Sequence, residues 1–343
     1  MTMKSVPVAE AVGMVLGHDV TRIIPGQCKG PAFKRGHIIQ KNEIDAFLDI
    51  GKEHVYVIDL SPGFVHEDEA AKRIASAAAG RGIRLTQPSE GRVNLVSEYK
   101  GLLKINTGAL ARLNGIGEIV FATLHTNHQV NAHQPVAGTR VIPLVVGEQN
   151  VSQAENLCRE CYPLIEIKTF KSLKIGMVIT GSEVYSGRVE DAFGPVVKKK
   201  FDQLGSVILR QVLVSDDRNK TISAIRQLIA EGAEMVTVTG GMSVDPDDQT
   251  PGAIRAAGAR VVTYGAPTFP GAMFMLAYIG DIPVVGLPGC VMYHKTSIFD
   301  LLIPRLLAGE AVTKKDIEKM GHGGFCAGCS ECRYPLCGFG KCD

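Results

Sequence analysis

Strand-like and helix-like segments alternate regularly from residue 172 onward, and this alternation restricts the fold more than any other feature of the sequence. Most of the apolar runs are separated by segments whose apolar residues recur at helical spacing or whose ends carry residues typical of helix boundaries. A further, apolar helix is expected at 296–309. The strand-like runs lie at 173–180, 206–214, 234–241, 260–267 and 282–289, and the helical segments at 195–205, 219–233 and 250–258. Strands linked by crossover helices are parallel, so the pattern predicts a three-layer α/β domain with a mostly parallel sheet over 172–311.

Two other regions flank this domain. Residues 1–165 contain strand-like runs and one helix that ends at Gly80, a pattern typical of an N-terminal α+β region. The strand-like runs lie at 54–59, 91–98 and 118–125, and the helix at 67–80. Residues 312–343 form a basic stretch followed by a small cysteine-rich tail. We therefore expect a division into 1–165, 172–311 and 312–343.

Charge and hydropathy exclude several classes of partner. The formal net charge of +2 gives no electrostatic case for nucleic acid or an anionic membrane surface. No apolar stretch reaches the ~18 residues that a membrane span needs. The first residues, MTMKSVPVAEAVG, lack the unbroken apolar run of a signal peptide. We expect a cytoplasmic protein whose nine cysteines are free thiols or metal ligands.

The loops after the predicted strands carry the candidate site, because ligands bind at the carboxyl ends of an open parallel sheet. Four loops leave those ends, at 180–191, 215–220, 239–248 and 287–293. The first three carry Glu183, Asp191, Asp216, Asp217, Asp245, Asp247 and Asp248, beside the donors Thr239, Gly240, Gly241 and Ser243. Donors beside carboxylates suit a phosphate-bearing ligand whose charge is neutralised by Mg²⁺, which prefers oxygen ligands.

Helix capping is the alternative for any one of these acids. Asp216 or Asp217 could cap the helix that follows, for which Asn219 is also a candidate cap. Three acidic loops that converge on one sheet edge favour the ligand site.

The order and spacing of four motifs match a known family. TGSEV with GRVED, then SDD, then TGGMSVDPDDQTP, then LPGC resemble the molybdopterin-binding domain of molybdopterin molybdotransferases and adenylyltransferases, over about 172–310. The resemblance of residues 1–165 to the preceding part of molybdotransferases is weaker. The resemblance implies adenylylated molybdopterin as ligand, with Mg²⁺ and molybdate.

Individual residues fall on the motifs of this family. Glu183 matches the glutamate of a TGDEL-like motif and Asp191 the aspartate of a DSN-like motif. Asp216 matches an acidic pair before a helix, and Asp248 the aspartate before a TP pair. The resemblance implies catalytic roles for these four, with Asp248 and Asp216 acting on Mg²⁺ and molybdate. It implies cofactor-binding roles for Thr180, Gly181, Thr239, Gly240, Gly241, Ser243, Pro288, Gly289 and Cys290.

Four positions depart from the family's pattern. Ser182 replaces the aspartate of TGDEL, and Phe193 replaces the asparagine of DSN. Ala272 replaces a lysine and Cys290 an asparagine, which removes a positive charge and an amide from the expected surroundings of an anion. Cys290 could ligate molybdenum or receive sulfur, or be a buried small hydrophobe.

The tail has the spacing CxxCxxCx4Cx4C, formed by Cys326, Cys329, Cys332, Cys337 and Cys342. Thiols at this density, with few apolar residues, are typical of a metal-bound knuckle, and Zn²⁺ or a [4Fe–4S] cluster would each use four of them. A disordered reduced tail is the alternative.

Two other groups of metal-ligating residue types are interpreted as structural. Cys158 and Cys161 lie on an expected helix, whereas a redox CxxC follows a strand, so we expect core or incidental placement. His125, His128 and His133 are irregularly spaced, and we expect surface histidines on a loop.

The function that we expect is molybdenum-cofactor biosynthesis by a molybdotransferase-like enzyme. It would insert molybdate into adenylylated molybdopterin with Mg²⁺ and release AMP. The alternative is a non-catalytic carrier that delivers finished cofactor to a molybdoenzyme apoprotein. A cofactor-sensing regulator lacks support because there is no basic recognition helix. The family resemblance also raises the possibility of a homodimer, and the sequence leaves open molybdenum or tungsten.

Overall fold

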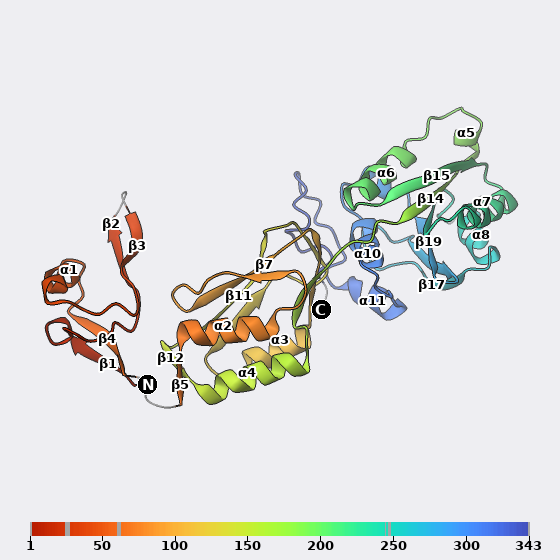
Figure 1. The fold of residues 1–343 in the computed structure, drawn as a ribbon. Coiled ribbons are helices and arrows are strands. Elements are labelled where there is room, and N and C mark those ends of the chain that lie inside the picture. Colours follow the sequence, from red (N-terminus) through yellow and green to blue (C-terminus); the bar gives the residue numbers. More distant parts are fainter. Residues whose placement is uncertain (1, 25–27, 60–62, 244, 246–247, 342–343) are drawn as a thin grey trace. The chain divides into compact units, whose positions relative to one another are not determined.

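The computed structural model describes residues 2–24, 28–59, 63–243, 245 and 248–341 (Figure 1). The chain divides into two compact units. Unit 1 is 1–126 with 130–167, and unit 2 is 127–129 with 168–343. Among the described residues, no helix is long and apolar enough to cross a membrane.

The first part of unit 1 is built from two antiparallel strand pairs around a small core. Strand β1 (Thr2–Pro7) pairs with β4 (His54–Asp59), and β2 (Val20–Ile24) pairs with β3 (Cys28–Phe33). Between them lie α1 (Ile44–Asp49) and the 3₁₀ turns Val8–Glu10 and Lys41–Glu43. Phe47 of α1 is fully buried and stacks on Phe33 with 3.9 Å between ring centroids. The strand predicted at 54–59 is confirmed as β4.

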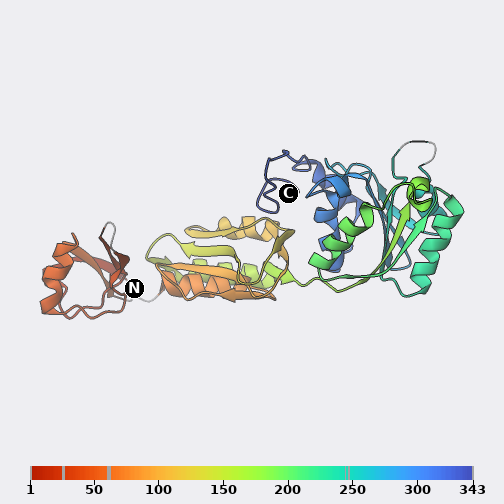
Figure 2. The ribbon, with the colours of Figure 1, turned by 90° about the horizontal axis from the view of Figure 1, so that it is seen from above.

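The second part of unit 1 is a helix-covered antiparallel sheet. Its strand order is β6-β7-β11-β9, beside a three-stranded sheet β10-β8-β13 and the pair β12-β5. The strands are β5 (Phe64–His66), β6 (Ile83–Leu85), β7 (Arg92–Ser97), β8 (Gly101–Ile105), β9 (Ile119–Thr123), β11 (Pro135–Val141), β12 (Val145–Gly147) and β13 (Ile165–Lys168). Strand β10 (His128–Val130) begins in the segment 127–129, which is assigned to unit 2. The helices are α2 (Glu67–Ala78), α3 (Thr107–Asn114) and α4 (Glu148–Glu160), and Figure 2 shows α2 (orange) and α4 (yellow-green) along the sheet.

Helix α2 shows why this sequence folds locally as it does. The side chains of Ala70, Ile74 and Ala78 recur at a spacing of four and are fully buried, which is the pattern of a helix with one apolar face. The helix and the strands that the sequence predicts in this region are confirmed, with ends shifted by a few residues.

Unit 2 contains a six-stranded sheet with the order β15-β14-β16-β19-β18-β17. Its strands are β14 (Lys174–Thr180), β15 (Val207–Val214), β16 (Met235–Thr239), β17 (Arg260–Tyr264), β18 (Met275–Ile279) and β19 (Ile282–Leu287). Strands β15, β14, β16 and β19 are parallel. Their carboxyl ends therefore share one edge of the sheet, which we call the carboxyl edge; the opposite edge is the amino edge.

Helices cover both faces of this sheet and confirm the three-layer α/β class. The helices are α5 (Ser182–Tyr185), α6 (Phe193–Gln203), α7 (Arg218–Ala230), α8 (Thr250–Ala256), α9 (Cys290–Tyr293), α10 (Ile298–Leu307) and α11 (Lys314–Glu318), followed by the 3₁₀ turn Lys319–Gly321. Helices α6 and α10 pack in one core and α7 and α8 in the other (Figure 1). Successive residues of β14 alternate between the cores: Met177 contributes to the first and Val178 to the second.

One local expectation for unit 2 is wrong, and one choice between candidate helix caps is decided. Strand β18 is antiparallel to β19 because the two-residue loop Gly280-Asp281 reverses the chain between them. Strand β17 is antiparallel to β18, and the described chain between these two strands contains no crossover helix. Helix α7 is capped by Asp217 rather than Asn219: the Asp217 carboxylate accepts hydrogen bonds from the backbone N–H groups of Asn219 and Lys220.

The cysteine-rich tail packs on unit 2 over residues 322–341, which we call the tail segment. The Phe339 side chain is buried in the core that α10 shares. The Tyr334 hydroxyl donates to the Asp300 carbonyl at 2.9 Å, at the start of α10. The tail segment is thus fixed against unit 2 by the buried Phe339 side chain and by the hydrogen bond of Tyr334.

Candidate functional site

A cavity of about 670 Å³ lies at the carboxyl edge of the sheet in unit 2. Predicted site residues from the loops after β14, β16 and β19 line it. These are Thr180, Glu183, Asp191, Thr239, Gly240, Gly241, Ser243, Asp248, Pro288, Gly289 and Cys290. Gly181 and Asp216 do not line it. The structure therefore brings together most of the residues that the sequence singled out.

The glycine pair after β16 presents bare backbone to this cavity. Gly240 has φ +83°, and a Cβ there would collide with the carbonyl oxygen of Thr180. Gly241 has φ +55°, and a Cβ there would lie 2.9 Å from the hydroxyl of Thr250. Any side chain would thus be both strained and obstructed, so the position requires glycine.

Thr180 contributes a buried hydroxyl beside the glycine pair. Its Oγ1 has no hydrogen-bond partner within the described part of the chain, and the residue is 6% exposed. Buried polar groups are nearly always hydrogen-bonded, so an unpaired hydroxyl in a cavity wall is available to a ligand.

Asp248 closes the loop that follows the glycine pair. Its carboxylate accepts a hydrogen bond from the Asp245 N–H at 3.0 Å, and its own N–H donates to the Asp245 carbonyl at 2.9 Å. Burial, and then the charge of Asp248, raise the pKa of the neighbouring Tyr264, whose hydroxyl donates to the Met242 carbonyl at 3.1 Å. Asp248 is therefore a positioned carboxylate in the cavity wall. Asp247 lies outside the described residues.

Asp216 links two loops instead of entering the cavity. Its carboxylate accepts from the Ser182 N–H at 2.8 Å, and the Ser182 hydroxyl accepts from the Asp216 N–H at 3.2 Å. This reciprocal pair holds the loop that carries Glu183. Ser182, a departure from the family pattern, thus has a structural role.

Asp191 lines the cavity while holding the start of α6. One carboxylate oxygen accepts from the N–H groups of Phe193 and Gly194 at 2.9 and 3.0 Å, and the other accepts from the Gln211 amide at 2.8 Å. The capping alternative therefore describes the contacts of Asp191, as it does those of Asp217.

Cys290 lies at the first position of α9 and in the cavity wall. Burial raises the pKa of its thiol. The neutral thiol therefore predominates at neutral pH, which weakens Cys290 as a metal ligand or nucleophile unless a bound metal displaces the proton.

The described cavity lining carries charges of one sign only. Its ionisable carboxylates are Glu183, Glu190, Asp191 and Asp248, and no lysine or arginine is among the described residues that line it. An anionic ligand that approached the glycine backbone would be repelled by these carboxylates unless a cation accompanied it.

Aromatic and sulfur-containing side chains form the part of the wall that sequence reasoning missed. Phe269 and Tyr293 line the cavity and are 59% and 78% exposed, and Met292 lies beside them. The available signal was a pair of aromatic residues, Phe269 in the loop before β18 and Tyr293 at the end of helix α9, which follows β19. They follow no periodic pattern, so only the fold brings them together.

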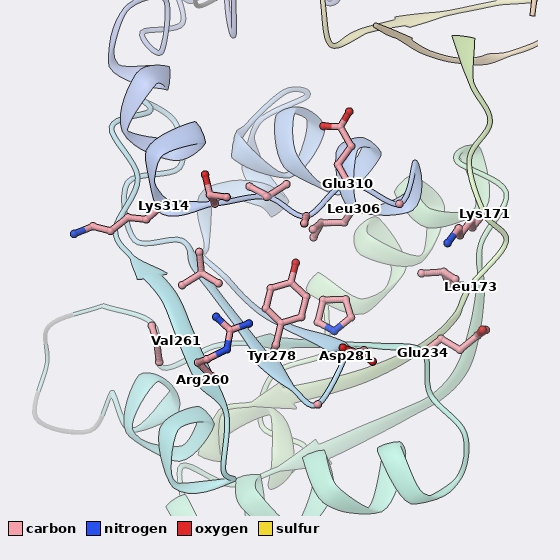
Figure 3. Close-up of a pocket in the computed structure, with 17 residues that line it drawn as sticks. Lys171, Leu173, Glu234, Arg260, Val261, Tyr278, Asp281, Leu306, Glu310 and Lys314 are labelled. Atoms are coloured by element: carbon pink, nitrogen blue, oxygen red, sulfur yellow. The ribbon is translucent and has the colours of Figure 1, made fainter. Parts of the chain in front are cut away.

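A second and larger cavity, of about 730 Å³, lies at the amino edge and contains none of the predicted site residues (Figure 3). Arg260 lies over the Tyr278 ring at 5.7 Å. Glu310 is bound by Arg305 at 2.9 Å, and Glu234 accepts from the Lys174 N–H at 2.9 Å. Charges of both signs with partners in the protein indicate a structural role, so we place the candidate site at the smaller cavity.

The tail cysteines do not gather in this structure. Within the described residues, no group of three or more His, Cys, Asp or Glu side chains has a metal-binding arrangement. Cys326 and Cys337 pack against the unit 2 core, the Cys332 sulfur lies 3.2 Å from the Thr296 hydroxyl, and Cys329 is exposed. Cys342 lies outside the described residues. A thiolate metal site in the tail stays a prediction.

The cysteines and histidines interpreted as structural have mixed outcomes. Cys158 is buried in α4, and burial raises the pKa of its thiol to about 11, which confirms core placement. His125 and His133 are exposed as expected. The expectation for His128 is wrong: it is 3% exposed on β10, and its Nδ1 lies 2.7 Å from the Lys341 Nζ.

Comparison with known proteins gives a domain match at the sheet just described. Residues 176–308 match a family model described as "Probable molybdopterin binding domain", and residues 5–59 match a domain of unknown function. CinA-like proteins of Mycobacterium sp. (strain MCS) and Mycobacterium avium (strain 104) are 39% and 38% identical over 80 residues. These 80 residues are 23% of this chain and 19% and 18% of those proteins, so the match spans about a fifth of the relatives' length.

Solved structures with similar folds are distant in sequence. The molybdopterin biosynthesis enzyme MoaB from Thermus thermophilus is 16% identical, and the match covers 40% of this chain and 98% of that one, with a TM-score of 0.33. CinA from Thermoplasma acidophilum, a protein of unknown function, is 17% identical over 34% of this chain and 89% of its own, with a TM-score of 0.29.

Proposed function

Because residues 176–308 are a divergent member of the molybdopterin-binding domain family, we propose that the carboxyl-edge cavity binds adenylylated molybdopterin and supports molybdate insertion with release of AMP. Membership of this family supports a role related to molybdenum-cofactor biosynthesis and a pterin as the ligand class. The reaction, the nucleotide and the metals are our proposal.

One observation carries this proposal: an acidic cavity rim stands beside bare glycine backbone. Gly240 and Gly241 line the cavity without side chains, and Asp248 and Glu183 supply negative charge in the same cavity. A phosphate and these carboxylates are compatible only with a divalent cation between them. Carboxylate oxygens are ligands that Mg²⁺ prefers, so the donor set fits this ion.

The contacts divide the acidic residues into two roles. We assign Asp248 and Glu183, which line the cavity, to Mg²⁺, an ion that would neutralise the phosphates and molybdate. Asp216 and Asp191 receive positioning roles, because their carboxylates bind backbone N–H groups of the same rim. Thr180, with its unpaired buried hydroxyl, would donate to a phosphate or molybdate oxygen.

The experiment that tests this function is AMP release from adenylylated molybdopterin under anaerobic conditions. We expect release that requires both molybdate and Mg²⁺. Binding of the substrate with no release under any of these conditions would contradict the enzyme and leave a binding protein. Tungstate in place of molybdate shows which oxyanion is used.

A non-catalytic cofactor carrier is the second candidate, and the departures at Ala272 and Cys290 favour it. Both residues line the cavity, where a lysine and an asparagine would contact anionic ligand atoms. A carrier would bind finished cofactor with an affinity comparable to that for the adenylylated precursor and would transfer it to a molybdoenzyme apoprotein. Equilibrium binding of the two ligands distinguishes the candidates.

The tail metal and the domain division are separate proposals. We propose that four of the five cysteines Cys326, Cys329, Cys332, Cys337 and Cys342 bind Zn²⁺ or a [4Fe–4S] cluster as thiolates, which requires cysteine side chains that do not gather in the described residues to come together. Metal analysis of anaerobically purified protein tests this directly. The division at about residues 165–172 and 311 likewise stays a proposal, as does a homodimer.

A further inference from the structure

The tail segment forms backbone hydrogen bonds with the wall of the carboxyl-edge cavity. The N–H of Phe269, a cavity residue, donates to the Gly324 carbonyl at 2.8 Å. The N–H of Cys326 donates to the Phe269 carbonyl, also at 2.8 Å. Phe269 and Phe325 therefore pair in the manner of parallel strands, and both backbone polar groups of Phe269 are bound by the tail.

This pairing sets the Phe325 ring beside the ring of Phe269, a residue that lines the cavity. Phe269 and Phe325 are 59% and 76% exposed, and their ring centroids are 6.4 Å apart with an angle of 48° between the planes. Exposed apolar rings at the wall of a cavity leave a large area for a ligand to cover, at about 25 cal/mol for each Å² buried.

The rest of the tail segment holds Phe325 in place. Tyr334 is partly buried and donates to the Asp300 carbonyl at 2.9 Å, and Phe339 is 3% exposed. A Cβ at Gly340 would collide with the Leu301 side chain, so the tail backbone lies directly on α10 there. With these anchors, Phe325 is part of a fixed surface, and its exposure is maintained by the fold.

We propose that the tail segment completes the ligand site: Phe325 and Phe269 form an aromatic platform that binds the planar fused nitrogen heterocycle of the phosphate-bearing ligand. This inference rests on the proposed function. The cavity is then two-ended, with the glycine backbone and Asp248 at a phosphate end and the aromatic platform at a heterocycle end. A flat nitrogen ring system stacks on an aromatic ring with a gain that an aliphatic side chain does not supply.

Two heterocycles of the proposed substrate have this chemistry, a pterin and an adenine. Two probes separate them: 6-hydroxymethylpterin phosphate, which is fluorescent, and AMP, each with Mg²⁺ present. The chain contains no tryptophan, so protein emission does not mask the pterin signal. Quenching of pterin fluorescence reports stacking, and calorimetry of the full-length protein gives the affinity for either probe.

The variants are Phe325→Ala and Phe325→Tyr, with Leu336→Ala as the matched control. Leu336 is an apolar side chain of the same tail segment and is 71% exposed, and it does not line the cavity. We expect Phe325→Ala to weaken binding of one probe about tenfold. Phe325→Tyr should keep that affinity, and Leu336→Ala should bind as the wild type does. All the replaced side chains are exposed, so the fold should survive.

The outcomes separate this inference from the proposed function. Weakening of the pterin phosphate alone, or of AMP alone, supports the platform and identifies the ring that it holds. Wild-type affinity for both probes in Phe325→Ala overturns the platform while leaving the proposed function intact. Failure of the wild-type protein to bind either probe overturns both. Equal loss in Phe325→Ala and Leu336→Ala overturns the platform in favour of a general effect of the tail.

Discussion

The carboxyl and amino edges of the unit 2 sheet both border a cavity, and the two cavities use charge in opposite ways. At the amino edge, Glu310 and Glu234 are bound by groups of the protein itself. At the carboxyl edge the described lining carries only acidic charge, beside a buried threonine hydroxyl with no partner in the described chain. Size does not separate the two, since the larger cavity is at the amino edge. Unsatisfied groups mark the candidate ligand site.

Removing one acidic charge from each edge is the strongest test of this comparison. Asp248→Asn should abolish AMP release, because it removes a proposed Mg²⁺ ligand while preserving size. Asp281→Asn, in the amino-edge cavity, should release AMP at the wild-type rate. The two substitutions are chemically identical, so equal rates in both variants would remove the functional distinction between the edges.

Arg305→Ala tests whether the amino edge serves stability. The Arg305 side chain is 9% exposed and binds both Glu310 and Asp316, at 2.9 and 3.2 Å. Loss of one partner of a buried ion pair costs about 3–5 kcal/mol of unfolding free energy. Lys314→Ala, an exposed lysine of the same cavity, should change it by at most about 0.5 kcal/mol. Urea unfolding measures both variants. A stable Arg305→Ala protein would show that these pairs do not hold the edge together.

Two glycine substitutions separate backbone strain from a collision with Thr180, a residue of the cavity wall. Gly240 and Gly232 both have positive φ, +83° and +95°, but only at Gly240 would a Cβ meet another atom. Alanine at either position should cost about 1–2 kcal/mol of unfolding free energy, and more at Gly240 because of the collision with Thr180. Ligand binding by calorimetry should be lost only in Gly240→Ala. Retained affinity in that variant would show that ligand binding does not depend on the packing of Gly240 against Thr180.

The smallest expected effect is acid sensitivity at the amino edge. Although burial opposes it, hydrogen bonds from Thr313 and the charge of Arg305 hold the pKa of Asp316 below its usual 3.8. A carboxyl whose pKa is lower in the folded state stabilises the protein above its unfolded pKa, and this contribution is lost as the pH falls below about 4. Wild type should exceed Asp316→Asn in stability by about 1 kcal/mol or less at pH 7, and the gap should close between pH 4 and 2. If the two proteins still differ in stability at pH 2, the difference does not arise from ionisation of Asp316.

The sequence predicted those parts of the fold and the candidate site that depend on local pattern. The runs ending at Thr180, Thr239 and Leu287 are parallel strands, and their loops meet at one edge as expected from crossover connections. Strand β18 was not predicted, because Gly280-Asp281 forms a hairpin loop in a region where the pattern predicted parallel strands. The roles of Asp216 and Asp191 were not predictable, since a carboxylate that binds backbone N–H groups has the same sequence signature as one that binds Mg²⁺.

Contacts between residues far apart in the sequence are the second reason why parts of the fold and the site could not be predicted. The burial of His128 and the partial burial of Tyr334 depend on packing of the tail segment within unit 2, which no periodicity in a glycine- and cysteine-rich segment predicts. Phe269 was not predicted as a site residue for a similar reason. It lines the cavity, but its loop follows an antiparallel edge strand, outside the parallel pattern from which the site was predicted.

The position of β19 also has a consequence for synthesis of the chain. This strand lies between β16 and β18 in the interior of the sheet, yet it begins at Ile282, more than forty residues after β16 ends at Thr239. At about 5–20 residues per second, the ribosome leaves one side of β16 without its hydrogen-bond partner for several seconds. An apolar strand edge open for that time can pair with another nascent chain, so crowded polysomes favour aggregation of unit 2. Slower translation after residue 287 would not relieve this, whereas faster translation of 240–281 would.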